Sequence, residues 1–207
     1  MTFYFLPNLD LTIASVFIDA GGHFFIGQTM GGIWAREIAA AAPFVILGGM
    51  IIAYLANRWG RPIGRAPTLR SLAFLILSFS LGSGVVVNLG MKDHLHRPRP
   101  IQVTEFGGPY IYRQFYQWDG GCPRHCSFPS GEASAAFWLV APASLAPPPY
   151  RPAAVGGALV FGIITSLLRM AFGGHFLSDV IFSALITIWL VVIIHWLVFR
   201  RRVGSLN

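Results

Sequence analysis

Four long apolar runs dominate the pattern of this chain. Residues 38–56, 71–91 and 152–168 carry no charged side chain, and residues 180–199 carry only His195 as an ionisable group. A helix needs about 20 mostly apolar residues to cross the hydrocarbon core of a bilayer. Each of the four runs is therefore predicted to be a transmembrane helix.

A fifth apolar run, residues 133–146, is shorter. Glu132 precedes it, and the prolines at 147–149 follow it and would end a helix. This run can cross the membrane only if its first helical turn starts at Ser130. The expected fold is an all-α, polytopic bundle of about five transmembrane helices.

Residues 1–37 are expected to form an N-terminal interfacial segment ahead of the transmembrane domain, which is expected to cover residues 38–207. Residues 11–28 of this segment include Asp19 and His23, which do not suit a membrane span. No basic stretch precedes an apolar one, so no signal peptide is predicted.

The composition supports a membrane protein and excludes other classes. Hydrophobic residues make up 55% of the chain and charged residues 11%, whereas soluble domains carry roughly 25% charged residues. A soluble globule of this size could not bury that much apolar surface. Disordered, disulfide-rich and coiled-coil classes are excluded by the same composition.

Arginine predicts how the bundle is oriented. With five spans, one face receives the loop after the first run, the turn before residues 152–168 and the C-terminal tail. Their arginines are Arg58, Arg61, Arg65, Arg70, Arg151, Arg200, Arg201 and Arg202. By the positive-inside rule this face is cytoplasmic. We expect a multi-pass protein of the inner (plasma) membrane whose other face is periplasmic or exterior.

The outer face nevertheless carries basic residues, against that rule: Lys92, Arg97, Arg99, Arg113 and Arg124. Their position suggests that they have a function there. Nucleic-acid binding is a poor explanation of the net charge of +7, because the basic residues are divided among loops between apolar runs. The bilayer and an anionic lipid are the partners that this distribution favours.

Polar residues that are distant in the sequence are predicted to meet at the outer face. They lie at the ends of the second to fifth spans: Lys92, Arg99, Ser130, Gly131, Glu132, Arg169, His175 and Asp179. These residue types suit phosphate, because Lys and Arg can neutralise its non-bridging oxygens. Ser130 is a favourable N-cap, and Gly131 lets backbone N–H groups approach an anion at a helix start.

His175 and Asp179 supply the groups for the chemical step. They are spaced i,i+4 on one helix face, where a carboxylate can hold the imidazole in one tautomer. A neutral imidazole is a nucleophile toward phosphorus. Phosphoryl transfer depends mostly on positioning and charge stabilisation, so no metal or other cofactor is expected.

Three ordered motifs resemble those of the type 2 phosphatidic acid phosphatase (PAP2) family, which shares its site with the vanadium haloperoxidases. They are Lys92-x6-Arg99-Pro100, Pro129-Ser130-Gly131 and Arg169-x5-His175-x3-Asp179. The resemblance implies a phosphohistidine on His175, with Asp179 as its partner. It implies that phosphate is bound by the other motif residues: Lys92, Arg99, Ser130, Gly131 and Arg169. Arg97 is implied to be an accessory cation beside them. Membrane members usually have six helices, so we expect this chain either to lack the first or to start late.

Glu132 departs from the family motif, because the second motif ends in a histidine that protonates the leaving group. Nearby cations and the helix start should lower the pKa of Glu132, whereas a bound phosphate dianion and burial act in the opposite direction. Either Glu132 is an acid only with substrate bound, or the leaving group needs little protonation, as a diphosphate would. Some bacterial lipid A phosphatase-like members look similar at this position.

The leading hypothesis is a membrane phosphatase that acts on a lipid phosphate or diphosphate at the outer leaflet. The alternatives are a lipid phosphotransferase with the same phosphohistidine, and a non-catalytic phosphate-binding protein disabled by Glu132. Candidate substrates are undecaprenyl diphosphate, lipid A and glycerophospholipid phosphates. A transporter is least favoured, because the ionisable groups lie at span ends rather than near mid-membrane.

Cys122 and Cys126 lie in the outer loop. A disulfide is expected between them if that face is periplasmic, and two free thiols are the alternative. Together with His125 they would form a metal site that lacks a fourth ligand.

Overall fold

The computed structural model describes residues 2–61, 66–91 and 94–200. Four residues named in the sequence predictions fall outside this range: Arg65, Lys92, Arg201 and Arg202.

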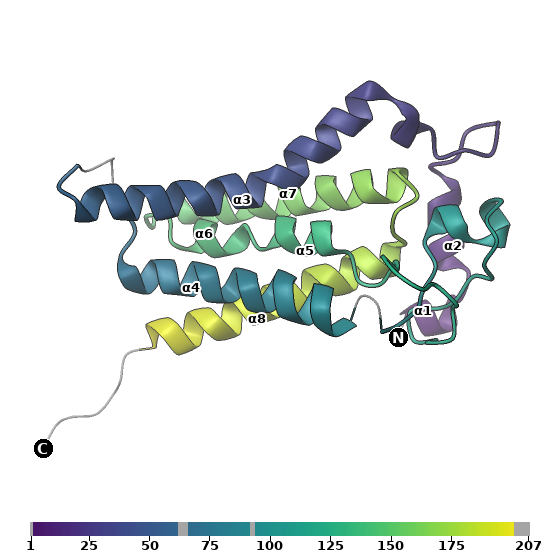
Figure 1. Cartoon of the computed structure of the whole chain (residues 1–207). Coiled ribbons are helices and arrows are strands. Elements are labelled where there is room, and N and C mark those ends of the chain that lie inside the picture. The colour runs from purple at the N-terminus through teal and green to yellow at the C-terminus, as the bar shows by residue number, and fades with distance from the viewer. Residues whose placement is uncertain (1, 62–65, 92–93, 201–207) are drawn as a thin grey trace, which may run out of the picture.

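The described residues form a helix bundle with two isolated β-bridges and no strand. Its main elements are α3 (Met30–Arg58), α4 (Leu69–Phe79), the π-helix η2 (Ser80–Met91), α5 (Gly131–Phe137), α6 (Val140–Ser144), α7 (Arg151–Ala171) and α8 (Leu177–Phe199). Figure 1 shows that successive passes alternate in direction, with η2 continuing α4 and α6 continuing α5. The all-α polytopic bundle expected from the sequence is confirmed.

Four helices in the described part of the chain are long and apolar enough to cross a membrane: Met30–Arg58, Leu69–Val87, Arg151–Ala171 and Leu177–Phe199. Three of them contain a whole apolar run, and Leu69–Val87 covers most of the run at residues 71–91. The first helix begins earlier than its apolar run, because Arg36 and Glu37 interrupt the apolar pattern but not the helix. Thr29 caps its N-terminus and accepts a hydrogen bond from the backbone N–H of Gly32 at 3.1 Å.

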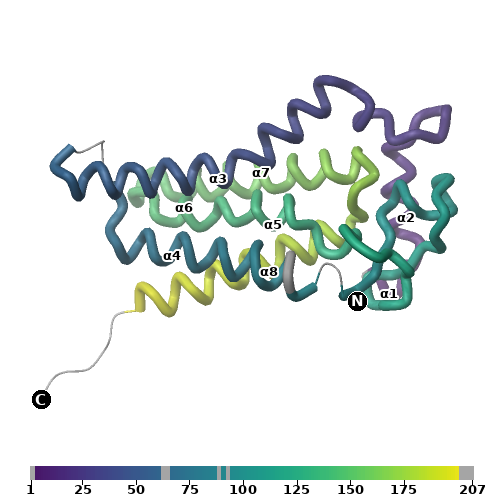
Figure 2. The backbone as a smooth tube through the Cα atoms, in the orientation of Figure 1, coloured from purple at the N-terminus to yellow at the C-terminus, as the bar shows by residue number. Residues whose placement is uncertain are grey.

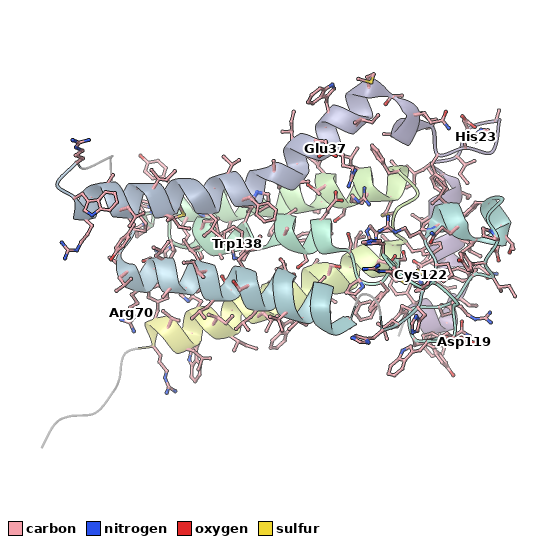
Figure 3. All side chains as sticks on the ribbon, viewed as in Figure 1. His23, Glu37, Arg70, Asp119, Cys122 and Trp138 are labelled. Atoms are coloured by element: carbon pink, nitrogen blue, oxygen red, sulfur yellow. A yellow bond between two sulfur atoms is a disulfide. The ribbon has the colours of Figure 1, made fainter. Side chains whose placement is uncertain are left out.

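α3 is bent in its N-terminal half, near Glu37, as Figure 3 shows. Pro43 lies inside the helix one to two turns further on. A proline in a helix interior removes a backbone hydrogen bond and clashes with the preceding turn, which explains the bend.

The short fifth run forms two helices instead of one. α5 and α6 are separated at Trp138 and Leu139 and together lie in the middle of the bundle (Figure 2). α5 contacts α3, η2, α7 and α8, so its polar backbone is covered by protein rather than by lipid. Trp138 is fully buried and donates its indole N–H to Ser78 Oγ at 2.9 Å.

α5 and α7 pack closely because Gly162 of α7 has no side chain. A Cβ at this position would lie 2.5 Å from the ring of Phe137. The outward faces of the long helices are apolar and include exposed Trp189 and Trp196 on α8, as expected for surfaces that contact lipid.

The two ends of the bundle differ. One end gathers the ends of α3 and α8 and the starts of α4 and α7 (Figure 1), and therefore the described arginines Arg58, Arg61, Arg70, Arg151 and Arg200. The other end carries shorter helices and a long loop. The shorter helices are α1 (Thr2–Phe5), α2 (Leu9–Ser15), η1 (Phe25–Gln28), η3 (Pro100–Gln102) and η4 (Thr104–Phe106).

Part of the N-terminal segment packs into the protein. Asp10 and Ala14 of α2 are 1% and 2% exposed. The sequence pattern suggested a segment lying at the membrane surface, and that location stays a prediction for the rest of residues 1–37. For α2, the structure shows an element built onto the end of the bundle.

Candidate active site

The candidate site lies where α7 turns into α8. α7 ends just before the glycine pair 173–174. Gly173 has φ +62°, a left-handed conformation that glycine adopts without strain. The turn brings His175 against the loop that precedes α5, since His175 Nδ1 lies 2.6 Å from the backbone carbonyl oxygen of Ser127.

The contact with Ser127 determines the tautomer of His175. A carbonyl oxygen can only accept a hydrogen bond, so Nδ1 of His175 carries the proton and donates it. The lone pair of a neutral imidazole is then on Nε2. Burial lowers the pKa of His175 to about 4, and the positive charges of Arg169 and Arg99 act in the same direction. His175 is therefore neutral at pH 7 and presents a nucleophilic Nε2.

Asp179 lies beside His175, as the i,i+4 spacing predicted, but the hydrogen bond of Nδ1 goes to another group. His175 Nδ1 lies 3.7 Å from Asp179 Oδ2, because its hydrogen bond goes to the Ser127 carbonyl. Asp179 instead accepts hydrogen bonds from the Ser127 hydroxyl and from the backbone N–H of Phe176, the latter at 2.7 Å. Ser127, which the sequence motifs did not indicate, is thus the link between Asp179 and His175.

Arg97 is held by protein groups rather than turned toward a ligand. It is fully buried and forms ion pairs with Asp179 and Asp10. Its Nε donates to the Arg113 carbonyl oxygen at 2.8 Å, and its Cζ lies 4.5 Å from the ring centroid of Phe176. The accessory phosphate-binding role that the resemblance implied does not fit this environment, because two carboxylates already neutralise the guanidinium.

Arg169 has the environment expected of an anion-binding residue. It is 5% exposed, and among the described residues its Nε is a buried donor without a hydrogen-bond acceptor. Buried donors normally have acceptors, so this one would gain a hydrogen bond from an anion that displaced the Glu132 carboxylate, whose Oε2 lies 3.4 Å away. A Cβ at Gly174 would lie 2.6 Å from Arg169 Nη2, so only glycine leaves room for the guanidinium in this position.

Glu132 lies between two guanidinium groups. Arg36 Nη2 is 2.7 Å from Glu132 Oε1 and Arg36 Nε is 3.3 Å from Oε2. Arg169 Nε lies 3.4 Å from the same Oε2 atom. Both arginines favour the ionised carboxylate and hold the pKa of Glu132 below its usual range, although burial acts in the opposite direction.

Arg36 was not among the predicted site residues. The apolar run that begins at residue 38 placed it in the N-terminal segment. Its position could have been predicted from the topology. With five alternating passes, the start of the first span lies at the same end of the bundle as the turn between the fourth and fifth spans, which holds His175.

Arg99 and Ser130 lie at the same end of the bundle. Arg99 donates from Nε to the His125 carbonyl oxygen at 2.7 Å. Ser130 is the predicted N-cap, since its Oγ accepts from the backbone N–H of Ala133 at 3.3 Å. The backbone N–H of Ser130 is donated to Ser183 Oγ at 2.8 Å, and its carbonyl oxygen accepts from the backbone N–H of Ser134 at 3.0 Å. The hydroxyl is therefore the group of Ser130 that can still donate to a phosphate.

Cys122 and Cys126 are joined by a disulfide with a Cα–Cα distance of 5.8 Å. The metal site considered for these sulfur atoms with His125 does not fit this arrangement, because a disulfide offers no thiolate. Elsewhere in the described parts of the chain, no group of three or more His, Cys, Asp or Glu side chains is placed to hold a metal.

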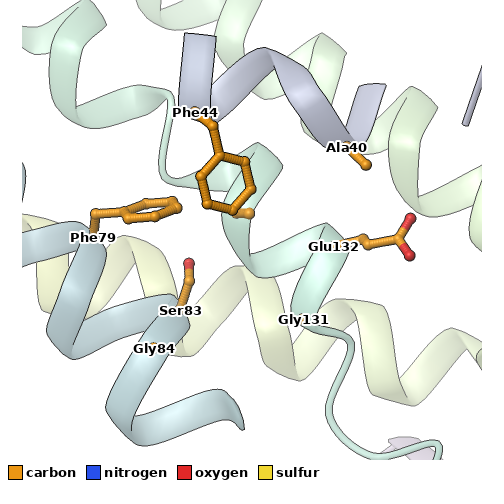
Figure 4. A pocket seen from close by; sticks show the side chains of 8 residues that line it. Ala40, Phe44, Phe79, Ser83, Gly84, Gly131 and Glu132 are labelled. Carbon is orange, nitrogen blue, oxygen red and sulfur yellow. The ribbon is translucent and has the colours of Figure 1, made fainter. Parts of the chain in front are cut away.

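An apolar groove opens beside Glu132. Its volume is about 340 Å³, and it is lined by residues of α3, α4, η2 and α5: Ala40, Phe44, Phe79, Ser83, Gly84, Gly131, Glu132 and Ala135. Figure 4 shows Phe44 and Phe79 facing each other at one end of the groove, with Glu132 at the other. The groove therefore runs from the charged site into the membrane-spanning part of the bundle.

Comparisons with known proteins agree with this arrangement. The model of the PAP2 superfamily matches residues 73–203. A lipid A 4'-phosphatase of Francisella tularensis subsp. novicida is 31% identical over 97% of this chain and 90% of its own length. A lipid A 4'-phosphatase of Rhizobium leguminosarum is 29% identical over 84% of this chain and 81% of its own. No solved structure matches the chain.

Proposed function

Because this chain belongs to the PAP2 superfamily, we propose that it is a membrane phosphatase that removes a phosphate group from a lipid, and that the lipid is lipid A. The proposed substrate rests on the two relatives, which are lipid A 4'-phosphatases and align with most of this chain. The 4'-phosphate of lipid A is accordingly the group that we expect to be released.

The observation that carries the proposal is the state of His175. Its Nδ1–H is donated to Ser127 and its imidazole is buried and neutral, so Nε2 is a free nucleophile. Arg169, with a buried donor that lacks an acceptor, lies close enough to His175 to affect its protonation. A phosphate group bound to Arg169 would bring its phosphorus atom near Nε2.

The reaction would proceed in two displacements. In the first, Nε2 of His175 attacks phosphorus, an N–P bond forms and the bond between phosphorus and the lipid oxygen breaks. In the second, water attacks the phosphohistidine and releases inorganic phosphate. Lys92, Arg99 and Arg169 would stabilise the charge on the non-bridging oxygens, with Ser130 and Gly131 at the start of α5 beside them. Charge stabilisation comes from these side chains, so we expect EDTA to leave turnover unchanged.

Glu132 occupies the place from which the departing lipid oxygen would receive a proton. In the free protein its ion pairs with Arg36 and Arg169 keep it ionised. A phosphate dianion would compete with Glu132 for Arg169, which weakens this ion pair and favours proton uptake by Glu132. We therefore assign Glu132 the role of an acid that acts only in the complex with substrate.

The groove beside Glu132 supports a lipid as the substrate. Its walls are mostly apolar, and it reaches from the charged residues toward Phe44 and Phe79. Hydrocarbon that leaves water for such a surface gains roughly 25 cal/mol per Å². A lipid can thus place its phosphate at Arg169 and part of an acyl chain in the groove.

The active site would face the periplasm. The bundle end with His175 lies opposite the end that gathers Arg58, Arg70 and Arg151, and an excess of arginine is typical of cytoplasmic ends. Lipid A in the outer leaflet of the inner membrane would present its phosphate groups on that side.

The proposal is tested by phosphate release from purified protein in detergent, with EDTA present. Lipid A, undecaprenyl diphosphate and phosphatidic acid would be compared, each with and without an added alcohol acceptor. We expect lipid A to be hydrolysed with the highest kcat/KM and the phosphate to go to water. Preference for another lipid would refute the substrate, and transfer of phosphate to the acceptor would make the protein a phosphotransferase. The absence of any release would support a non-catalytic binding protein.

A further inference from the structure

Asp10, in the short helix α2, is one of the most deeply buried carboxylates of the described chain, with 1% of its surface exposed. It lies outside residues 73–203, which match the family model, and no motif pointed to it. Its partners are distant in the sequence. Asp10 Oδ2 accepts from Arg97 Nη2 at 2.7 Å, across 87 positions, and from the Ser178 hydroxyl, across 168 positions.

Asp10 also supports the first turn of α8. The backbone N–H of Ser178 donates to Asp10 Oδ1 at 2.8 Å. The first N–H groups of a helix have no partner within the helix, so a carboxylate that accepts from one of them fixes the helix start. Asp179, the next residue, is positioned by the same turn.

Arg97 connects Asp10 to Asp179. Its Nη2 donates to Asp10, and its Nη1 donates to Asp179 and, at 2.8 Å, to Ser178 Oγ. One guanidinium therefore bridges two carboxylates in a site without solvent, where charge-assisted hydrogen bonds are strong and directional. Removing the charge of one carboxylate would therefore weaken one side of this bridge and alter how Arg97 holds the other carboxylate.

The contacts continue from Asp179 to the nucleophile. Asp179 accepts from the Ser127 hydroxyl, and the Ser127 carbonyl oxygen accepts from His175 Nδ1 at 2.6 Å. Asp10, Arg97, Asp179, Ser127 and His175 thus form one continuous network of hydrogen bonds. The network begins in the N-terminal segment and ends at the atom that determines the tautomer of the imidazole.

We propose that Asp10 is a positioning residue of the active site: through Arg97 and the start of α8 it fixes Asp179 and Ser127, and thereby fixes the tautomer and orientation of His175. The inference rests on the proposed function, in which Nε2 of His175 attacks phosphorus. It makes the N-terminal segment a part of the catalytic unit. Arg99 and Arg169 do not contact Asp10, so the proposal predicts an effect on the chemical step rather than on phosphate binding.

The test is Asp10→Asn in the full-length protein in detergent, with the lipid that the wild-type protein hydrolyses fastest. Asparagine keeps the size and one acceptor but removes the charge. We expect kcat to fall about 10-fold to 100-fold, as is typical when a supporting residue is lost, with KM within about twofold. Asp10→Glu, which keeps the charge, should recover part of kcat. Asp19→Asn is the matched control, because Asp19 is an exposed carboxylate of the same segment, and its side-chain partners within the described ranges are Gly21 and His23.

A second measurement does not depend on turnover. In ¹⁵N spectra of histidine-labelled protein, His175 is identified by the signal missing from His175→Asn. We expect the Nδ1–H tautomer in the wild-type protein and a mixture of tautomers in Asp10→Asn. If the wild-type protein hydrolysed no lipid, the proposed function would fail, and these spectra would still decide the role of Asp10. Wild-type kcat with an unchanged spectrum would overturn the proposal. So would an Asp10→Asn protein that is unfolded at the assay temperature, because Asp10 would then be a residue of stability alone.

Discussion

Glu132 and Arg36 show how single residues define this site. Glu132 stands where the family motif has a histidine, and Arg36 forms a two-point ion pair with it. An ionised carboxylate cannot donate a proton, so catalysis by Glu132 requires that substrate weaken its contacts with Arg36 and Arg169. This requirement distinguishes an acid from a residue that only positions the arginines.

The role of Glu132 is tested by the dependence on the leaving group. Glu132→Gln should slow the hydrolysis of alkyl phosphates about 10²-fold and that of a diphosphate much less, because a departing phosphate needs little protonation. Steady-state kinetics with both substrate types measure the difference. Glu37→Gln is the control, since Glu37 also pairs with Arg36, at 3.3 Å, but is exposed. An equal, small effect on both substrates would remove Glu132 from the catalytic residues.

The protonation of His175 gives a prediction about pH. Only the neutral imidazole attacks phosphorus, and a lowered pKa means that protonation begins at lower pH than usual. With a pKa of about 4 instead of 6.5, His175 should stay neutral as the pH falls from 8 to about 5 and lose its nucleophilic form only below that range. ¹⁵N spectra recorded against pH report this directly. A titration midpoint near 6.5, or a proton on Nε2, would contradict the assignment.

The residues of the site differ in how well the sequence predicted them. His175, Arg169 and Ser130 stand in short motifs, so their place at one end of the bundle followed from spacing and topology. Topology could have placed Arg36 at this end of the bundle, but its ion pair with Glu132, 96 positions away, could not be predicted. Asp10 could not be found in this way, because it contacts Ser178, 168 positions away. The link that Ser127 forms between Asp179 and His175 was missed for another reason. It depends on the backbone carbonyl of Ser127, and a backbone group has no signal in the sequence.

At the scale of elements, hydrophobic runs predicted the four long helices well, because a membrane span requires an uninterrupted apolar segment. The division of the fifth run into α5 and α6 was not predicted. These helices lie inside the bundle, where packing against Trp138 and Gly162 determines their course. The groove was also beyond prediction, because it exists only once α3, α4, η2 and α5 are packed together.

The groove gives a prediction at this scale. Gly84 lines it, and a Cβ there would meet nothing within 4 Å, so Gly84→Leu should fold and place its side chain in the groove. Each substrate methylene that the leucine keeps out of the groove loses about 0.8 kcal/mol of binding free energy. Two such groups already lower kcat/KM for a lipid roughly tenfold, whereas a short, soluble phosphate ester should be unaffected.

The matched control for Gly84→Leu is Gly156→Leu on α7. This glycine is also helical with open space around its Cα, and it does not line the groove. It should leave both substrates unchanged. Equal kinetics of Gly84→Leu and Gly156→Leu with lipid would show that no acyl chain occupies the groove.

The whole molecule is asymmetric in charge and in structure. The described arginines of the α3–α4 connection, the α6–α7 turn and the end of α8 lie at one end, and the site and the N-terminal helices lie at the other (Figure 1). This arrangement predicts the orientation in the membrane from the positive-inside rule.

The orientation is measured by cysteine labelling, in a background with Cys122 and Cys126 replaced by serine. An impermeant maleimide should label Pro109→Cys in intact spheroplasts and Arg61→Cys only after permeabilisation. Both positions are exposed, so accessibility to the reagent depends on the side of the membrane. Labelling of Arg61→Cys in intact spheroplasts would place the active site in the cytoplasm.

The central claim is that phosphate passes through Nε2 of His175, and trapping the phosphoenzyme tests it most directly. Protein would be mixed with lipid A carrying ³²P at the 4' position and quenched within milliseconds. The account predicts a label that is stable in alkali and lost in acid, as expected of a phosphoramidate, on the peptide that contains His175 and absent from His175→Asn. Turnover of the wild-type protein without any such label, or the same label on His175→Asn, would contradict it.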